Sequence, residues 1–441
     1  MKLSCEEISR IVSGELLGDN QMISDVVIDS RKIISHNTCF VAIGNGVNYI
    51  SDAIKKGAKL IISEEQFNGK VSKIYVHSVI KALGDLGKAN IGLTKIIAVT
   101  GSAGKTTTKE MIISVLREKF KVTGTIANQN NEIGVPLTLL AIKRDEDYCV
   151  VEMGMRKKGD IEYLASIVRP EISVITNCGN AHIENFIDAD EIFQAKTEII
   201  KYTRGSIIVP NEKRFVDLYK KNHRFKYIGK NGDVEAININ EQGSQLFFDV
   251  LCNGELIECI ELNTIYLHNI NNSLFAISIA KELGLSNEQI RAGLKKFRSK
   301  DLREEMVAIG KCEIVVDCYN ASYESMKSSI ESVTKYGKRK NKCVYLFLGD
   351  MLELGENSIN YHIEIGKMCK KIEVQGVFVH GELAKEIKRG FSKAEIIGTI
   401  DEMYERLLEK TSEDCIVLIK ASRKMRFERI INEVRERLNV E

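Results

Sequence analysis

The stretch IIAVTGSAGKTTTKEMI, residues 96–112, decides the fold of this chain. An apolar run over residues 95–100 ends in a glycine-rich turn, and after Lys105 apolar side chains recur at helical spacing. In the order strand, turn and helix, consecutive backbone N–H groups and a helix N-terminus can face one anion. We therefore predict a phosphate-binding loop.

The loop has a short spacing, G-x-x-G-K-T, whereas the standard pattern G-x-x-x-x-G-K-[ST] would need a glycine at Val99. Lys105 is expected to reach the β- and γ-phosphates of a nucleotide, and the Thr106 hydroxyl is expected to bind Mg²⁺. An ordinary strand-to-helix turn is the alternative. The residues expected to contact the nucleotide are Gly101, Ser102, Ala103, Gly104, Lys105, Thr106 and Thr107.

Length and charge limit the possible classes of protein. At roughly 150 residues per domain, a chain of 441 residues predicts about three domains. Lys and Arg number 63 and Asp and Glu 61, so the formal charge of +2 gives no support for a nucleic-acid partner. The densest basic run, KRKNK at residues 338–342, is interpreted as a solvated loop.

The eleven cysteines include no C-x-x-C pair, which excludes a zinc ribbon and a redox dithiol. With no secretory apolar region at the start of the sequence, they predict free thiols in a reducing compartment. No apolar run approaches the ~18 residues of a membrane span. We therefore expect a cytoplasmic protein without a membrane span.

β-like apolar runs alternate with helical patterns almost throughout, which indicates a parallel α/β architecture. We predict three units: a smaller N-terminal α/β unit over residues 1–83, a central unit with the phosphate loop over 84–298, and a C-terminal unit over 299–441. In the last, EIVVDCYN, CVYLFLGD, GVFVHG and CIVLIKAS are each followed by an amphipathic stretch. Four such β/α repeats predict a doubly wound, Rossmann-like fold.

Four further features follow the loop. NQNNEIGVPLTLL at residues 128–140 is a dense polar patch whose amides suit a neutral or peptide-like substrate, although a solvent-exposed loop is the alternative. Glu152 ends an apolar strand, at the edge where parallel sheets place ligands, and suits Mg²⁺. His182 follows a third strand. Lys196 by itself is interpreted as a helix-surface lysine.

Taken together, these motifs resemble the Mur ligase family over nearly the whole chain. The resemblance is strongest to the members that add D-alanyl-D-alanine to UDP-N-acetylmuramoyl-tripeptide. It begins at DSRK, residues 29–32, and extends to KASRKMRFERI, residues 420–430. Its most specific motifs are TGSAGKTTTKE (100–110), NQNNEIGVPLTLL (128–140), VVEMGMRKKGDIEYL (150–164) and LGDMLELGENS (348–358).

The resemblance implies an ATP-dependent ligase of peptidoglycan synthesis, with roles in cell-wall biogenesis, cell shape and cell division. It implies an N-terminal domain for the UDP-sugar, a central ATPase-like domain, and a C-terminal domain that receives the amino substrate. A substrate carboxylate would take the γ-phosphate of ATP, and an amine would attack the resulting acyl phosphate. The partners would be small molecules, and the enzyme would be a monomer.

The resemblance also assigns residues. The catalytic set would be Lys105, Glu152, His182 and Lys196, with Thr106, Glu152 and His182 as Mg²⁺ ligands and Lys196 carbamylated by CO₂. Asn269 of the HNINN motif, Arg303 and Asp317 would contact the nucleotide, although amide capping of a helix N-terminus also explains HNINN. The substrate contacts would be Ser30, Arg31, Asn130, Asn131, Glu132 and Asn320.

The chain departs from the family pattern in the two segments that would bind the UDP-sugar and the amino substrate. Residues 46–50 read GVNYI, with Val47 and Asn48 where the family often has Gly and His, and residues 322–326 read SYESM, with Tyr323 where the family has proline. Lys420 is followed by alanine instead of glycine. A related ligase with a different carboxylate and amine is therefore one alternative. A nucleotide-dependent switch without ligase chemistry is another.

Overall fold

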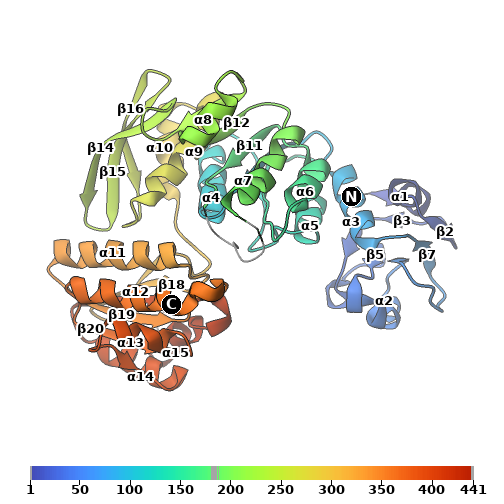
Figure 1. Cartoon of the computed structure of the whole chain (residues 1–441). Helices are drawn as coiled ribbons and strands as arrows, with labels where there is room; N and C mark the ends of the chain where they lie inside the picture. Colours follow the sequence, from blue (N-terminus) through green and yellow to red (C-terminus); the bar gives the residue numbers. More distant parts are fainter. Residues whose placement is uncertain (1, 180–185, 187, 439–441) are drawn as a thin grey trace.

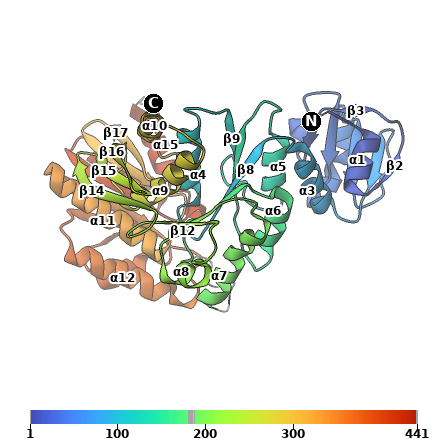
Figure 2. The same ribbon diagram turned by 90° about the horizontal axis from the view of Figure 1, so that it is seen from above.

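Three large sheets follow one another along the chain (Figure 1). The computed structural model describes residues 2–179, 186 and 188–438. The second sheet and its helices lie between the other two, and Figure 2 shows the same arrangement from above. Within the described residues, no helix is long and apolar enough to cross a membrane. The strand order and the intervening helices confirm the predicted mixed α/β architecture with parallel-rich sheets.

The first sheet has five strands, and alternate residues of its central strand enter separate cores on its two faces. Its edge strand β2 is antiparallel to β7, and the other neighbours are parallel. A two-stranded pair, β1 (Leu3–Ser4) with β3 (Met22–Ile23), flanks it. In spatial order the strands are β2 (Glu15–Leu17), β7 (Ser72–Tyr75), β6 (Leu60–Ser63), β5 (Thr38–Val41) and β4 (Asp25–Val27), and the helices are α1 (Cys5–Val12), α2 (Ile50–Lys55) and α3 (Val79–Asn90).

The second sheet carries the phosphate loop at the carboxyl end of strand β8 (Lys95–Thr100). This strand lies between β10 (Tyr148–Glu152) and β11 (Ile172–Ile175), so the chain leaves it in one direction to build β9 and β10 and in the other to build β11 onward. Such a reversal of strand order opens a crevice in which α/β sheets bind ligands. The remaining parallel strands are β9 (Val122–Gly124), β12 (Ile207–Pro210) and β13 (Phe225–Ile228).

Helices cover both faces of this sheet because β8 is apolar on both sides. One core contains residues of α4, α9 and α10, and the other contains residues of α5, α6, α7 and α8. The helices are α4 (Lys105–Leu116), α5 (Gly134–Leu140), α6 (Asp160–Val168), α7 (Ala189–Thr197), α8 (Lys213–Tyr219), α9 (His268–Glu282) and α10 (Asn287–Lys296).

An antiparallel extension of this sheet was not predicted. Strands β14 (Val234–Gln242), β15 (Gln245–Cys252) and β16 (Glu255–Leu262) form a meander at one edge. Burial alternates along β15, as expected of a strand with one solvated face. The turn between β15 and β16 is Asn253–Gly254, with φ of 48° and 85°, which is typical of a tight hairpin.

The third sheet confirms the four predicted β/α repeats and adds two edge strands. The order is β17 (Glu305–Ile309), β18 (Cys312–Asp317), β22 (Cys415–Lys420), β19 (Cys343–Gly349), β20 (Gly376–His380) and β21 (Glu395–Ile396), all parallel except β17. Helices α11 (Tyr323–Lys340), α12 (Ser358–Lys371) and α13 (Ile387–Gly390) lie on one face, and α14 (Ile400–Lys410) and α15 (Glu428–Leu438) on the other.

The basic run KRKNK is exposed at residues 338–341, as predicted, but most of it is helix and not loop. Its first three residues form the last turn of α11, where positive charge complements the helix dipole. Its last residue, Lys342, forms ion pairs with Glu313 at 2.7 Å and Asp414 at 2.9 Å. The run therefore ends a helix and joins neighbouring elements of the third sheet.

Candidate active site

Glycine is required at two positions of the phosphate loop. Gly101 has φ of 149° and Gly104 has φ of 76°, both in the region that side chains disfavour. A Cβ atom on Gly101 would lie 1.9 Å from Thr176 Oγ1, and one on Gly104 would lie 2.7 Å from Asn272 Oδ1. Helix α4 then begins at Lys105, so the predicted strand, turn and helix are confirmed.

Asn177, just beyond the end of β11, holds this loop and was not identified from the sequence. Its Oδ1 accepts hydrogen bonds from the backbone N–H groups of Ser102, at 3.1 Å, and Ala103, at 3.0 Å. Two successive N–H groups thus converge on one oxygen atom, which is the arrangement that a phosphate oxygen requires. In the sequence Asn177 is simply an asparagine after an apolar strand, a pattern too common to single it out.

The Lys105 ammonium group lies over the loop, where it donates hydrogen bonds to the carbonyl oxygens of Gly101 at 2.8 Å and Ser102 at 3.4 Å. Burial lowers the pKa of Lys105, and the charge of Arg303 lowers it further, whereas Glu152 acts in the opposite direction. Two opposite charges, those of Glu152 and Arg303, thus act on the Lys105 ammonium group in addition to its burial.

Glu152 joins the loop helix to the Asn-rich segment. Only 2% of Glu152 is exposed, and its Oε2 accepts a hydrogen bond from Thr106 Oγ1 at 2.8 Å. Its Oε1 accepts one from Asn130 Nδ2, also at 2.8 Å. Within the described residues, no group of three or more His, Cys, Asp or Glu side chains gathers as a metal site. The structure thus brings together two of the three expected Mg²⁺ ligands, and His182 lies outside the described residues.

The local sequence suggested that Lys196 lies on a helix surface, but the structure shows that it is buried. It lies on α7 with 2% of the residue exposed. Burial lowers its pKa to about 7, with a further contribution from the positive charge of Lys105 and an opposing one from Cys178. An amine with this pKa is about half neutral at pH 7 and becomes largely neutral at higher pH.

The HNINN motif begins α9, but amide capping does not explain it. The residue before the helix is Leu267, which makes no side-chain cap hydrogen bond. The Asn269 amide instead donates hydrogen bonds to Thr264 Oγ1 at 3.1 Å and Glu304 Oε2 at 2.7 Å. Its Oδ1 accepts a hydrogen bond from Asn272 Nδ2 at 2.9 Å. The motif therefore connects the central sheet with the segment before the third sheet.

Asp317 and Arg303 are positioned by other side chains of the third unit. Asp317 Oδ2 accepts hydrogen bonds from Ser329 Oγ at 2.8 Å and from the buried Lys420 Nζ at 2.5 Å. The guanidinium group of Arg303 lies over the ring of Tyr319, 3.6 Å from its centroid. Both side chains thus have defined orientations, and neither bonds the other.

The expected substrate contacts lie in three separate places. Ser30 Oγ donates to Asp52 Oδ2 at 2.5 Å, and Arg31 pairs with Asp29 at 2.8 Å, both in the first unit. In the Asn-rich segment, the exposed Asn131 accepts the N–H of Gly134 at 2.9 Å, and Glu132 is also exposed. Asn320 is exposed in the loop that follows β18. Only Asn130 joins the cluster around the phosphate loop.

Comparison with known proteins gives matches over the whole chain. The Mur ligase middle domain matches residues 99–280, and the Mur ligase glutamate ligase domain matches residues 303–423. Relatives from Bacillus subtilis (strain 168) and Haemophilus influenzae, both named UDP-N-acetylmuramoyl-tripeptide--D-alanyl-D-alanine ligase, are 30% identical, with 99% of each chain covered.

Solved structures agree with these matches. MurF from Acinetobacter baumannii superposes with a TM-score of 0.90 at 26% identity, covering 99% of both chains. MurF from Thermotoga maritima, in complex with ADP, gives a TM-score of 0.84 at 26% identity, covering 94% of this chain and 98% of that one. The fold and the phosphate loop, with these matches, define an ATP-dependent ligase. The chain belongs to the Mur ligase family.

Proposed function

We propose that this ligase adds D-alanyl-D-alanine to UDP-N-acetylmuramoyl-tripeptide in peptidoglycan precursor synthesis. The observation that carries the proposal is the 30% identity over 99% of both chains to relatives with that name. The nucleotide switch that the loop alone allowed is not supported, because both the middle and the glutamate ligase domains of the family match.

The reaction divides into two steps that the site can support. The tripeptide carboxylate attacks the γ-phosphorus of ATP, ADP leaves, and an acyl phosphate forms. The amino group of the dipeptide then attacks the acyl carbon, and phosphate leaves. Lys105, whose ammonium group lies over the loop, is placed to stabilise negative charge on the transferring phosphoryl group, which is the principal catalytic need. The N–H groups of Ser102 and Ala103 would add to this once a phosphate oxygen replaces Asn177 Oδ1 as their acceptor.

The residues present fit a Mg²⁺ ion beside the phosphates. Thr106 Oγ1 and Glu152 Oε2 are hard oxygen donors 2.8 Å apart, and the carboxylate is buried. Mg²⁺ in such sites commonly has one or two protein oxygens and completes its coordination with phosphate and water. When bound, it would neutralise charge on the β- and γ-phosphates. Thr106 and Glu152 would hold it, with Asn130 orienting the carboxylate.

The environment of Lys196 supports its carbamylation. The neutral amine attacks CO₂, an N–C bond forms, and one proton is released, so that a cation becomes a carboxylate-like anion. Burial and Lys105 lower the Lys196 pKa to about 7, which makes the neutral amine available. The resulting anion would lie near Lys105 and remove the repulsion between two like charges.

This proposal predicts a pH dependence that CO₂ modulates. Below a pH of about 7 Lys196 is protonated and cannot react with CO₂, so kcat at low, fixed dissolved CO₂ is expected to rise as pH increases through about 7. Higher CO₂ should shift the midpoint to lower pH because carbamylation competes with protonation. Phosphate release measured against pH at two CO₂ concentrations tests this. An identical midpoint at both concentrations would exclude the carbamate.

We also propose three domains that follow the three sheets. The expected boundary at residue 83 lies inside the continuous helix α3. This helix belongs to the first core through residues such as Leu86, and Asn90 Nδ2 donates to the carbonyl oxygens of Leu139 and Leu140. A boundary at residues 91–94 accommodates both facts. Ser30 and Arg31 would then contact the UDP-sugar from the first domain, and Asn131, Glu132 and Asn320 would contact the substrates nearer the loop. The cytoplasmic location and the monomeric state stay predictions.

Product analysis tests the substrate pair. Purified protein with Mg-ATP, bicarbonate, UDP-N-acetylmuramoyl-tripeptide and D-alanyl-D-alanine should form the pentapeptide and one phosphate per product. The second candidate is a related ligase with other substrates, and it is favoured by the departures from the family pattern at residues 46–50 and 322–326. Tyr323, which replaces the proline of the family, stacks on Tyr361 with ring centroids 4.8 Å apart. ATP turnover that appears only with another carboxylate and amine would support that candidate and overturn the first.

A further inference from the structure

Glu304 lies where the second and third units meet, outside the set of residues expected to contact nucleotide, metal or substrate. It belongs to the segment between α10 and β17, in which Asp301, Leu302 and Glu304 all have positive φ, of 59°, 61° and 52°. Such values are uncommon for residues other than glycine and need support from the surroundings. Glu304 follows Arg303 directly, so its contacts control where the arginine side chain begins.

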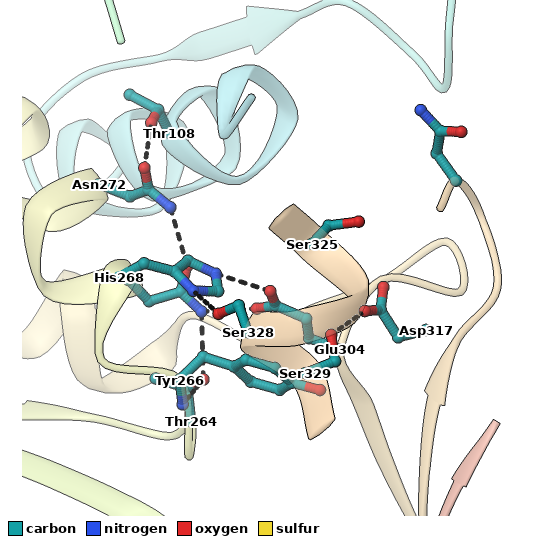
Figure 3. Close-up of polar contacts among 12 residues, drawn as sticks. Thr108, Thr264, Tyr266, His268, Asn272, Glu304, Asp317, Ser325, Ser328 and Ser329 are labelled. Atoms are coloured by element: carbon teal, nitrogen blue, oxygen red, sulfur yellow. Dashed lines mark hydrogen bonds and ion pairs between the residues drawn. The ribbon is translucent and has the colours of Figure 1, made fainter. Parts of the chain in front are cut away.

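Both carboxylate oxygens of Glu304 bind the start of α9 (Figure 3). Oε1 lies 2.7 Å from His268 Nε2, and both residues are labelled in Figure 3. Oε2 accepts a hydrogen bond from the amide of Asn269 at 2.7 Å. Burial acts to lower the pKa of His268, but the charge and hydrogen bond of Glu304 overcome it and raise that pKa. The Glu304 side chain is 14% exposed and that of His268 is 43% exposed, so the carboxylate is shielded from water whereas the imidazole is not.

The contacts continue from Glu304 to the phosphate loop. Asn269 Oδ1 accepts a hydrogen bond from the amide of Asn272. Asn272 Oδ1 in turn accepts one from the hydroxyl of Thr108, on the first turn of the loop helix, at 3.3 Å (Figure 3). The same Asn272 oxygen lies against Gly104 of the loop. A chain of side-chain hydrogen bonds therefore links the segment that carries Arg303 with the loop that would bind ATP.

Helix α11 of the third unit joins this connection at one end. His268 Nδ1 lies 3.3 Å from Ser328 Oγ on α11. Ile265 and Tyr266, which lie just before Leu267 and α9, belong to the core of the third unit, although they follow the last strand of the second sheet. The start of α9 thus contacts both units, and Glu304 binds it where the two units meet.

We infer that Glu304 is a positioning residue for phosphoryl transfer, whose carboxylate binds His268 and Asn269 and so directs Arg303 to the phosphate loop. The inference rests on the proposed function. Arg303 bonds none of the residues in this connection, but it directly precedes Glu304 and its guanidinium group lies over the ring of Tyr319. A displacement of Glu304 from His268 and Asn269 would therefore move the arginine relative to the phosphate loop. Glu304 acts through the hydrogen bonds of its carboxylate and touches no reacting atom.

The test compares Glu304→Ala and the isosteric Glu304→Gln with the wild-type ligase, by phosphate release and by thermal unfolding. Glu304→Ala is expected to lower kcat about tenfold with a smaller change in the KM for ATP, and Glu304→Gln about threefold because it still accepts from Asn269. The matched control is Glu241→Gln, which removes another ion pair between the units, with Arg339 on α11, and should leave kcat within about twofold.

A double-mutant cycle separates positioning from a general loss of stability. His268→Ala combined with Glu304→Ala should lower kcat no more than Glu304→Ala alone, because both remove the same interaction. Additive losses, or a kcat for Glu304→Ala within twofold of wild type, would overturn the inference. If Glu304→Ala does not fold, a wild-type kcat in Glu304→Gln would overturn it equally. Failure of the wild-type protein to turn over would instead contradict the proposed function.

Discussion

Substitution of Lys196 by alanine is expected to lower kcat for pentapeptide formation about 1000-fold. In the carbamylated state this side chain would supply a buried negative charge near Lys105, at the place where ATP would bind. Removal of one preorganised electrostatic group from such a site costs about 100- to 1000-fold in rate. Phosphate release at saturating substrates measures the loss. A short carboxylic acid such as formate should restore kcat to about a tenth of the wild-type value, because alanine leaves space for a carboxylate.

The matched control is Lys201→Ala. Lys201 lies near the end of α7, but it is 70% exposed and pairs with Glu162 at the surface. Its substitution should leave kcat within about twofold of wild type. Stabilisation of Lys196→Ala by ADP in a thermal-unfolding assay would show that its nucleotide site is intact. Wild-type turnover by Lys196→Ala would rule out a catalytic role for the carbamate.

The second large effect is expected for Glu152→Gln. The substitution preserves the shape and one carbonyl oxygen but removes the negative charge beside Thr106, so it should raise the Mg²⁺ concentration required for half-maximal rate at least tenfold. It should also lower kcat about 100-fold, since Lys105 loses the carboxylate that favours its charged form. Phosphate release titrated with Mg²⁺ measures both quantities.

Glu162→Gln is the control for that charge removal. Glu162 forms an ion pair with Lys201 at 2.8 Å at the surface of the same unit. Its substitution should change neither the Mg²⁺ midpoint nor kcat by more than about twofold. An unchanged Mg²⁺ midpoint in Glu152→Gln would contradict a metal site at Thr106 and Glu152, whatever its effect on kcat.

The parts of the fold that were predicted correctly are those that short stretches of sequence determine. Strand β8 covers the predicted apolar run at residues 95–100, and α4 begins at Lys105, because the apolar run, the glycine turn and the helical spacing are adjacent in the sequence. The four β/α repeats of the third sheet were found for the same reason. By contrast, the β14–β16 meander was missed although Asn253–Gly254 is a hairpin signal, because the surrounding α/β alternation favoured parallel strands.

The candidate site shows the same division. Glu152 was identified because it ends an apolar strand next to the loop strand. Lys196 gave no signal of its own, since its burial depends on α7 packing against distant elements. Asn177 and Glu304 were missed because their partners lie 75 and 36 residues away, at Ser102 and His268. Long-range hydrogen bonds of this kind follow from the assembled fold and leave no local pattern.

The most direct measurement follows oxygen from the carboxylate into phosphate. UDP-N-acetylmuramoyl-tripeptide labelled with ¹⁸O in its terminal carboxylate is incubated with the ligase, Mg-ATP, bicarbonate and D-alanyl-D-alanine. If the loop transfers the γ-phosphoryl group to that carboxylate, each pentapeptide formed should be accompanied by one phosphate containing one ¹⁸O from the substrate. Phosphate without ¹⁸O, released by ATP hydrolysis alone, would contradict phosphoryl transfer to the carboxylate.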